Sequence, residues 1–217
     1  AQAITFGVQP GQTYAAGGMF TINPQATASS NLAVVYSSQT ASVCTVSGST
    51  VTMVAAGVCT IAADQSGDAN WNAATQLTQN ITIGKGVQAI TFPVQGNQTY
   101  SPGGTFAISP VATASSSLAV VYSSLTTSIC TVSGSTVTMV FAGTCTIAAD
   151  QAGDTNWNAA TQAAQNVTIG KGTQTITFGV QSGQTYSFGG TFAISPTATA
   201  SSGLAVSYSS QSVSVCS

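Results

Sequence analysis

The sequence is a tandem repeat with a period of 86 residues. Cys44 and Cys130 are 86 residues apart, and residues 1–86 align with residues 87–172 without insertion or deletion. By direct count, 65 of these 86 aligned positions are identical, and residues 173–217 begin the same text again. This period is longer than the roughly 20–50 residues of a solenoid repeat and close to the size of a small sandwich domain. We therefore expect two complete domains, 1–86 and 87–172, and the N-terminal part of a third at 173–217.

Short β-strands are expected in each repeat because apolar and polar residues alternate with a period of two. In the first repeat, the alternating segments are residues 3–8, 19–22, 32–36, 43–48, 50–54, 58–63 and 80–84. Turn-forming Gly, Pro, Ser and Asn residues separate them. Seven short strands with outward polar positions predict an all-β fold, in which each repeat is an antiparallel β-sandwich. The only segment compatible with a short helical turn is residues 71–75.

The chain has almost no charge. Only 3% of its residues are charged, compared with about a quarter in an ordinary soluble protein. The two basic residues are lysines and there is no histidine. Nucleic-acid binding needs many basic side chains, and histidine is the usual group for proton transfer near neutral pH. No apolar run reaches the roughly 18 residues of a membrane-spanning helix. The composition therefore argues against a nucleic-acid partner, a membrane span and acid–base catalysis.

The cysteines predict a disulfide within each repeat. Cys44 and Cys59 both fall on the apolar side of their strands, and the second repeat has the same pair as Cys130 and Cys145. A bridge across 15 residues contributes roughly 3 kcal/mol in the chain-entropy model. The alternative is a pair of buried thiols in a reducing cell. Structural disulfides persist in oxidising compartments, so we expect an extracellular or cell-surface location.

Cys216 takes the first position of the third pair, and the residues after it do not include its partner. One interpretation is that the sequence is a fragment of a longer array. The other is that Cys216 bonds to a thiol of another chain. The first interpretation is favoured.

The text of residues 42–74, "SVCTVSGSTVTMVAAGVCTIAADQSGDANWNAA", resembles the bacterial immunoglobulin-like repeats of large surface proteins. The resemblance extends through a closing strand and a Gly-Lys junction, and it covers both full repeats and the start of the third. It implies immunoglobulin-like (Ig-like) sandwiches in a tandem, elongated array on bacterial adhesins, surface filaments or secreted matrix proteins. It implies no catalytic residues and no cofactor, so we expect that the chain is not an enzyme. Function still has to be argued from particular sites, because a fold does not determine it.

The loop "DQSGDANWN" has oxygen-bearing side chains at alternating positions, as a calcium-binding loop does. It lacks the closing bidentate glutamate of such a loop. The other interpretation is that Asp and Asn satisfy backbone donors of the loop and allow unusual backbone angles. We favour this second interpretation and expect no metal. The calcium candidates in the two repeats are Asp64, Asp68, Asn70, Asn72, Asp150, Asp154, Asn156 and Asn158.

Each complete repeat has one tryptophan, Trp71 or Trp157. A single tryptophan per sandwich usually plugs one end of the core or the seam between domains, and the alternative is stacking on a sugar ring. Three Asn-x-Ser/Thr triplets, at Asn80, Asn97 and Asn166, fit the pattern for N-glycosylation. In a bacterial product this pattern arises mostly by chance in threonine-rich text.

The only regular basic feature is the Gly-Lys-Gly triplet at each repeat boundary. A flexible linker is usually longer than three residues, so we expect short junctions with little play. The lysine is expected to be solvated beside the junction, or else to pair with an aspartate of the neighbouring domain. The junction residues are Gly84, Lys85, Gly86, Gly170, Lys171 and Gly172.

These features favour an extracellular structural protein that forms a stalk, filament or sheath on or around a bacterium. Nearly uncharged modules can pack side by side without electrostatic repulsion, so a homo-oligomer or fibre of identical chains is the expected partner. The alternative is an adhesin module that recognises a surface glycan or protein through loops at the ends of its sandwiches. Both complete repeats carry nearly the same loops, and none of these loops is long or rich in aromatic residues.

Overall fold

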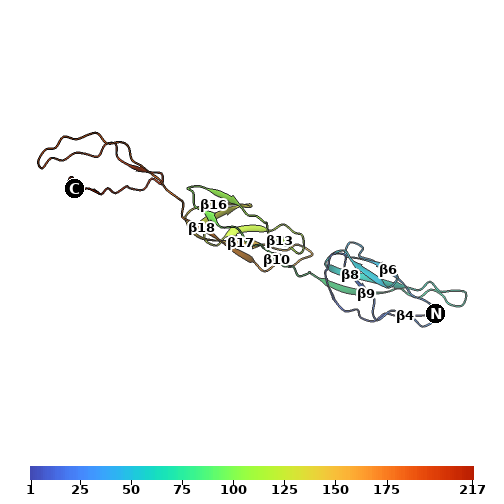
Figure 1. The fold of residues 1–217 in the computed structure, drawn as a ribbon. Helices are drawn as coiled ribbons and strands as arrows, with labels where there is room; N and C mark the ends of the chain where they lie inside the picture. The colour runs from blue at the N-terminus through green and yellow to red at the C-terminus, as the bar shows by residue number, and fades with distance from the viewer.

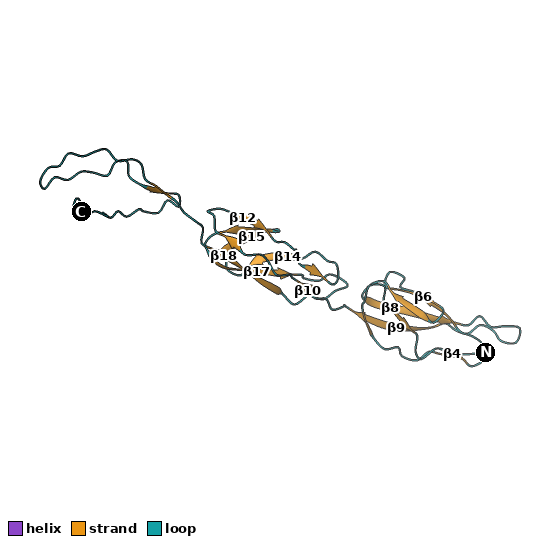
Figure 2. Ribbon diagram, in the orientation of Figure 1, coloured by secondary structure: helices purple, strands orange, loops and turns teal.

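The computed structural model describes the whole chain, residues 1–217, as three bodies in a row with the two termini at opposite ends (Figure 1). Every regular element is a strand (Figure 2). The predicted all-β class in an elongated tandem array is thus confirmed. Residues 71–75, the one segment compatible with a helical turn, form no regular element, and the backbone carbonyl of Asn72 accepts a hydrogen bond from Gln2 Nε2 at 2.8 Å. The structure has no helix of the length and apolarity needed to cross a membrane.

The first unit consists of strands β1 to β9, arranged in two main sheets and a separate pair. The four-stranded sheet has the order β2-β9-β8-β5, with bounds Gln12–Thr13, Leu77–Gly84, Gly57–Asp64 and Val35–Ser38. The three-stranded sheet has the order β3-β7-β6, with bounds Met19–Thr21, Thr50–Met53 and Cys44–Ser47. The separate pair is β1 with β4, at Ile4–Thr5 and Thr27–Ala28.

The second unit repeats this arrangement in strands β10 to β18. Its four-stranded sheet is β11-β18-β17-β14, with bounds Gln98–Thr99, Ala163–Gly170, Gly143–Asp150 and Val121–Ser124. Its three-stranded sheet is β12-β16-β15, with bounds Thr105–Ala107, Thr136–Met139 and Cys130–Ser133. The separate pair is β10 with β13, at Ile90–Thr91 and Thr113–Ala114. The remaining residues contain one pair, β19 with β20, at Ile176–Thr177 and Thr199–Ala200.

The strand order of each unit is that of an immunoglobulin-like sandwich. The orders β3-β7-β6 and β9-β8-β5 correspond to strands B-E-D and G-F-C of that fold. All pairs are antiparallel apart from β2 with β9 and β11 with β18, which are parallel. A parallel pair needs a long connection, and almost the whole unit lies between β2 and β9. The antiparallel sandwich expected from the sequence is confirmed, and one parallel pair is added at the edge of each four-stranded sheet.

Each unit has its own core between its two sheets. In the first unit, inward side chains alternate along the strands as expected: Val51 and Met53 on β7, and Ile81 and Ile83 on β9, are buried. Burial of one such side chain stabilises a fold by about 1.5–3 kcal/mol. Val8, which the alternation of residues 3–8 places on the same face as Ile4 and Phe6, is instead 82% exposed, because the alternation continues past the end of β1 only as far as Phe6.

The residues from 173 onward have no such core. Phe178 is 53% exposed, whereas its equivalents Phe6 and Phe92 are 5% and 7% exposed. This segment supplies the counterparts of β1 and β4 as a strand pair and contains no counterpart of β8 or β9. Its apolar side chains therefore have no second sheet to pack against.

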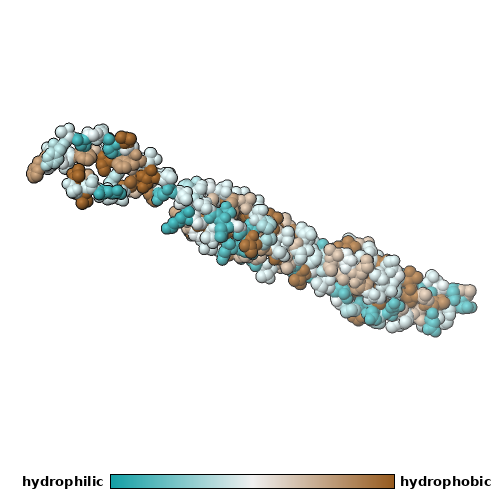
Figure 3. Space-filling view, in the orientation of Figure 1, coloured by the Kyte–Doolittle hydropathy of each residue, from teal (hydrophilic) through white to brown (hydrophobic).

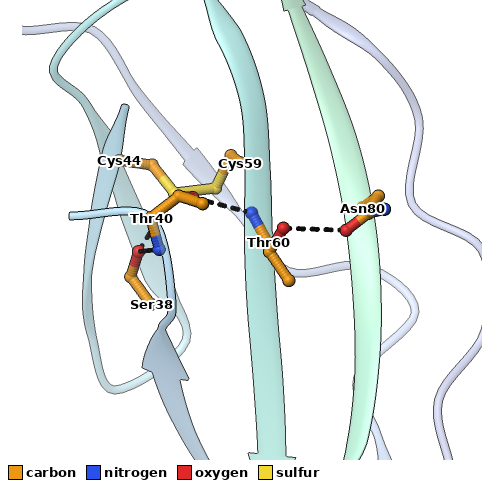
Figure 4. Close-up of a disulfide and its surroundings, with 6 residues drawn as sticks. All are labelled: Ser38, Thr40, Cys44, Cys59, Thr60 and Asn80. Carbon is orange, nitrogen blue, oxygen red and sulfur yellow. Dashed lines mark hydrogen bonds between the residues drawn. A yellow bond between two sulfur atoms is a disulfide. The ribbon is translucent and has the colours of Figure 1, made fainter. Parts of the chain in front are cut away.

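A disulfide joins the two sheets in each unit. Cys44 at the start of β6 is bonded to Cys59 on β8, with the Cα atoms 5.6 Å apart, and Cys130 is bonded to Cys145 in the same way. The first pair is fully buried. Figure 4 shows its surroundings, where Thr60 N donates to Thr40 Oγ1 at 2.9 Å. The bridge thus connects the central strand of one sheet to an edge strand of the other.

Candidate functional site: the junction between the two units

The connector between the two units is bonded into both of them. Gly84, the last residue of β9, accepts a hydrogen bond from Tyr14 N at 2.8 Å. Two residues later, Gly86 N donates to Asn156 O at 2.8 Å, and Gly86 O accepts from Asn158 N at 2.9 Å. Gly86 is buried and pairs with Trp157 as a parallel β-bridge. The connector is therefore hydrogen-bonded to the first unit at Gly84 and to the second unit at Gly86, with only Lys85 between them.

The part of the second unit that meets the connector is the loop between β17 and β18, at residues 151–158. Its shape is set within its own unit. Asp154 Oδ1 accepts hydrogen bonds from the backbone N–H groups of Asn156 and Trp157, both at 2.8 Å. Gln151 Oε1 accepts from Gly153 N and from Gln88 Nε2, both at 2.5 Å. The loop accordingly holds Trp157 in place through bonds that do not involve the first unit.

The turn of this loop requires glycine. Gly153 has φ of +77°, which L-residues with a side chain rarely adopt. A Cβ atom there would lie 2.3 Å from Trp157 O, so any other residue would displace the backbone next to the tryptophan.

Side chains of this loop reach across to the first unit. The Trp157 ring packs edge-on against Tyr14, with centroids 5.5 Å apart and an interplanar angle of 78°. Asn156 Oδ1 accepts a hydrogen bond from Ala56 N at 2.9 Å. An edge-to-face aromatic pair contributes about 0.5–1.5 kcal/mol beyond its buried area. The contact therefore combines an aromatic pair with hydrogen bonds on both sides of the connector.

Lys85 also takes part in this contact. Its Nζ donates to the backbone carbonyl of Asp154 at 2.5 Å, and its own carbonyl accepts from Asn158 Nδ2 at 3.3 Å. The bond to Asp154 is made to the main chain and not to the carboxylate, so no ion pair forms. Lys85 thus contacts the main chain of Asp154 in the neighbouring unit, while the Asp154 carboxylate accepts hydrogen bonds within its own loop.

Gly86 lies where no side chain fits. A Cβ atom at this position would lie 2.5 Å from Tyr14 O and 2.7 Å from ring atoms of Trp157. Both distances are below normal contact, so the close approach of the two units depends on glycine here.

The same groups lie uncovered at the two ends of the array. In the first unit, Trp71 is 38% exposed and Asn70 is exposed, whereas Asn156 and Trp157 are half-buried. At the far end of the second unit, Lys171 and Gly172 are exposed. The structure thus contains one assembled junction and the separate halves of two more.

The aspartates among the calcium candidates bond to groups of their own units. No group of three or more His, Cys, Asp or Glu side chains is present. Asp68 Oδ1 accepts from the N–H groups of Asn70 and Trp71 at 2.8 Å, as Asp154 does in the second unit. Both oxygens of Asp64 lie within 3.0 Å of Gln76 Nε2, and Asp150 has the same partner in Gln162. Asp68 and Asp154 thus satisfy backbone donors of their loops, as the favoured interpretation expected, whereas Asp64 and Asp150 bond to glutamine side chains.

The asparagines of the three glycosylation triplets accept hydrogen bonds from neighbouring strands. Asn80 and Asn166 accept from Thr60 and Thr146 Oγ1 at 2.8 Å (Figure 4 shows the first of these bonds). Asn97 Oδ1 accepts from Thr168 N at 3.3 Å.

Two surface hollows contain no charged or thiol side chain. Both lie beside Tyr36 on the first unit and contain no Asp, Lys or Cys. The Tyr36 hydroxyl accepts a hydrogen bond from Ala26 N at 2.6 Å, which gives it a structural role.

Cys216 is exposed and forms no disulfide within the chain. The hydroxyl of Ser210 lies 3.3 Å from its sulfur. No other cysteine is left for it, because the other four are paired.

Searches against protein-family models and against curated proteins each found no match. Several solved structures are distantly similar. Drosophila N-cadherin EC1-3 is 9% identical, with 78% of this chain and 67% of that chain covered and a TM-score of 0.31. Surface layer protein SbsC, domains 1-6, is 14% identical, with 82% and 29% covered and a TM-score of 0.28. A C-terminal fragment of intimin, in complex with the intimin-binding domain of its translocated receptor, is 16% identical, with 66% and 52% covered and a TM-score of 0.28.

Proposed function

We propose that the protein is an extracellular structural repeat protein that forms a stalk, filament or sheath on a bacterium. The observation that carries this proposal is the assembled junction, in which Gly86 is bonded on both sides to the loop of the next unit. A connector of this kind keeps the two sandwiches in line, so each added unit adds length. The buried disulfides agree with an oxidising compartment outside the cell, and the bacterial source rests on the family resemblance of residues 42–74.

The surface chemistry supports a passive role. Figure 3 shows units whose surfaces are mostly pale, with scattered apolar and polar patches. The chain has a formal net charge of −2, so neighbouring rods would repel one another weakly and charged ligands would not be attracted from a distance. This agrees with a building material, including one in which identical chains pack side by side, and with the proposal that the chain is not an enzyme.

The alternative function is recognition of a ligand by loops at the end of a sandwich. In this structure, a contact between the two units already uses one of these loops. The most prominent aromatic loop of the second unit, which carries Trp157, is already occupied by the first unit. In an array, the same loop of every internal unit would be covered in this way. The loops therefore favour a role in joining units over a role in binding a glycan.

The rod can be tested with Trp157→Ala, because this change removes the aromatic contact without changing the connector. We expect small-angle X-ray scattering to show a shorter mean end-to-end distance and a broader spread of angles between the units than in the unchanged chain. Trp71→Ala is the matched control, because it removes the equivalent ring from a loop with no unit in front of it. If the unchanged chain already shows freely bending units, the proposed function fails.

A further inference from the structure

Strand β5 lies at the edge of its sheet and has one free side. Its only partner is β8, and Gln39 N donates to Thr60 O at 2.9 Å at the end of this pair. In an antiparallel pair, residues bonded to the partner strand alternate with residues whose backbone groups point away from it. The backbone groups of Tyr36 and Ser38 therefore point away from β8, and no turn or loop of the chain bonds to them.

The second unit has the same free side on β14. Leu125 N donates to Thr146 O at 2.9 Å, so the backbone groups of Tyr122 and Ser124 point away from β17 in the same way. Both strands have the sequence Val-Tyr-Ser-Ser. We call β5 and β14 the free edges.

Nothing in the sequence protects the free edges from pairing with another strand. Natural sheets protect an edge with charged side chains, proline or a β-bulge. Residues 31–41 and 117–127 contain no charged residue and no proline, and the register of each edge strand with its neighbour runs without a bulge. The free edges are therefore able to accept a further strand.

The free edges stay uncovered inside the array. Val121 points outward from β14, in a unit with a neighbour on each side, and it is 68% exposed, compared with 67% for Val35 on β5. The exposure of the edge therefore does not depend on the position of the unit in the array. Open space also lies beside β5, where two hollows are lined by its residues together with Gly48 in one and Ala28 in the other. An approaching strand thus has room beside this edge.

The edge strand of the other sheet, β6, is less suited to association. Its outward side chains, Thr45 and Ser47, are exposed and polar, so pairing there would bury little apolar surface. The free edges offer more of it. Besides the exposed valine of each strand, Val111 replaces Gln25, which lines both hollows, and Val111 is 53% exposed.

We propose that copies of this chain associate side by side, with a free edge of one copy adding as a strand to a free edge of another. This inference rests on the proposed function, because it joins single rods into a multi-chain fibre. A second copy is the partner that fits, since it offers the same uncharged Val-Tyr-Ser-Ser strand with the same spacing and rotation from unit to unit. Two such strands can pair antiparallel about a two-fold axis, which joins two four-stranded sheets into one.

Residues 1–172 provide the sample for the test, because each of these two units has its own core and its own disulfide. We expect a dissociation constant on the order of 10⁻⁴ M, since two short strands make a small contact. Sedimentation velocity from about 10 μM to about 1 mM spans this value. The mean sedimentation coefficient should rise across this range.

The variant that combines Val35→Lys with Val121→Lys tests the edge, because an outward lysine protects an edge strand from pairing and both positions are exposed. Association should weaken about tenfold or more, since like charges would meet across each pair of edges. Val8→Lys combined with Val94→Lys is the matched control. It makes the same change of charge at positions that are 82% and 78% exposed and lie outside the free edges, so its association should persist.

Amide hydrogen exchange, followed by NMR, gives a second readout that is specific to strand pairing. The N–H groups of Tyr36 and Ser38 should exchange rapidly in the single chain and become protected as concentration rises. The N–H groups of Tyr122 and Ser124 should behave in the same way.

A chain that stays monomeric over the whole concentration range overturns the inference. Association that the paired lysines leave unchanged, or that leaves these four amides unprotected, also overturns it and places the contact on another surface. Each of these results leaves the proposed rod standing, because stiffness is measured on single chains in dilute solution.

Discussion

At the scale of single residues, equivalent side chains of the two repeats can have different surroundings. Trp71 and Trp157 lie in nearly identical local sequences, yet only Trp157 has a ring, Tyr14, to pack against. Buried glutamines are a residue type that the sequence analysis missed. Gln9 is 5% exposed, and its amide bonds to Gly7 O, Pro24 O and Asn23 N. Gln9 falls in the turn that follows residues 3–8, where a polar residue is expected to be exposed, so no sequence signal marked it as buried.

The Cys44–Cys59 disulfide leads to a testable prediction at the scale of single residues. Replacement of Cys44 and Cys59 by alanine should lower the free energy of unfolding of the first unit by about 3 kcal/mol, because the unfolded chain loses its closed loop. Urea unfolding under non-reducing conditions measures this change. The matched pair Cys130→Ala and Cys145→Ala should affect the second unit instead. Equal destabilisation of both units by either pair would show that the two cores do not unfold separately.

At the scale of elements, strands were predicted where alternation was long enough. The central strands β8 and β9 have eight residues each and carry clear inward rows. Strands β2 and β4 have only two residues each, and two residues cannot show a period. They exist because neighbouring strands offer backbone partners, which is a property of the assembled sheets. The seven predicted strands of each repeat therefore became nine.

The docked loop makes a prediction at the scale of elements, because the chain has only two sites for trypsin, Lys85 and Lys171. Proteases need an extended, accessible backbone, and Gly86 is buried and bonded on both sides. Cleavage after Lys171 should therefore come first. A docked state favoured by about 1.4 kcal/mol slows cleavage after Lys85 about tenfold, if cleavage follows the open population.

Limited digestion followed by mass spectrometry measures both rates in one sample. Trp157→Ala should speed cleavage after Lys85 and leave cleavage after Lys171 unchanged. Trp71→Ala should alter neither rate. Equal rates after both lysines in the unchanged chain would contradict the bonded junction.

At the scale of the whole molecule, the scarcity of charge affects stability as well as solubility. The chain has no histidine, and four of its five cysteines are in disulfides. Few side chains therefore change protonation between about pH 5 and pH 9 on unfolding, and few exposed charges are available for salt to screen.

The prediction at this scale is that thermal stability depends little on pH. Under non-reducing conditions, the midpoint of unfolding should change by less than about 3 °C between pH 5 and pH 9, because folding is linked to proton uptake only through groups that titrate in this range. Calorimetry at several pH values provides the measurement, with the same series in added salt as the control. A large loss of stability at either end of the range would reveal a titrating group that the composition does not show.

The sequence by itself determined the repeat, the all-β class, the main strands and the two cysteine pairs. Period-two alternation is a local property, and an exact spacing of 86 residues places equivalent residues in equivalent folds. The Gly-Lys-Gly triplet also marked the junction between the units, because a connector of three residues allows them little relative motion.

Only the tertiary structure decided what happens at that junction. The bond from Gly86 to Asn156 and the ring contact from Tyr14 to Trp157 join residues that are 70 or more positions apart, and no local pattern relates them. The same is true of the parallel pairing of β2 with β9 and of the buried glutamines. Each depends on where the folded sheets place a distant partner, and that position follows from packing of the whole unit.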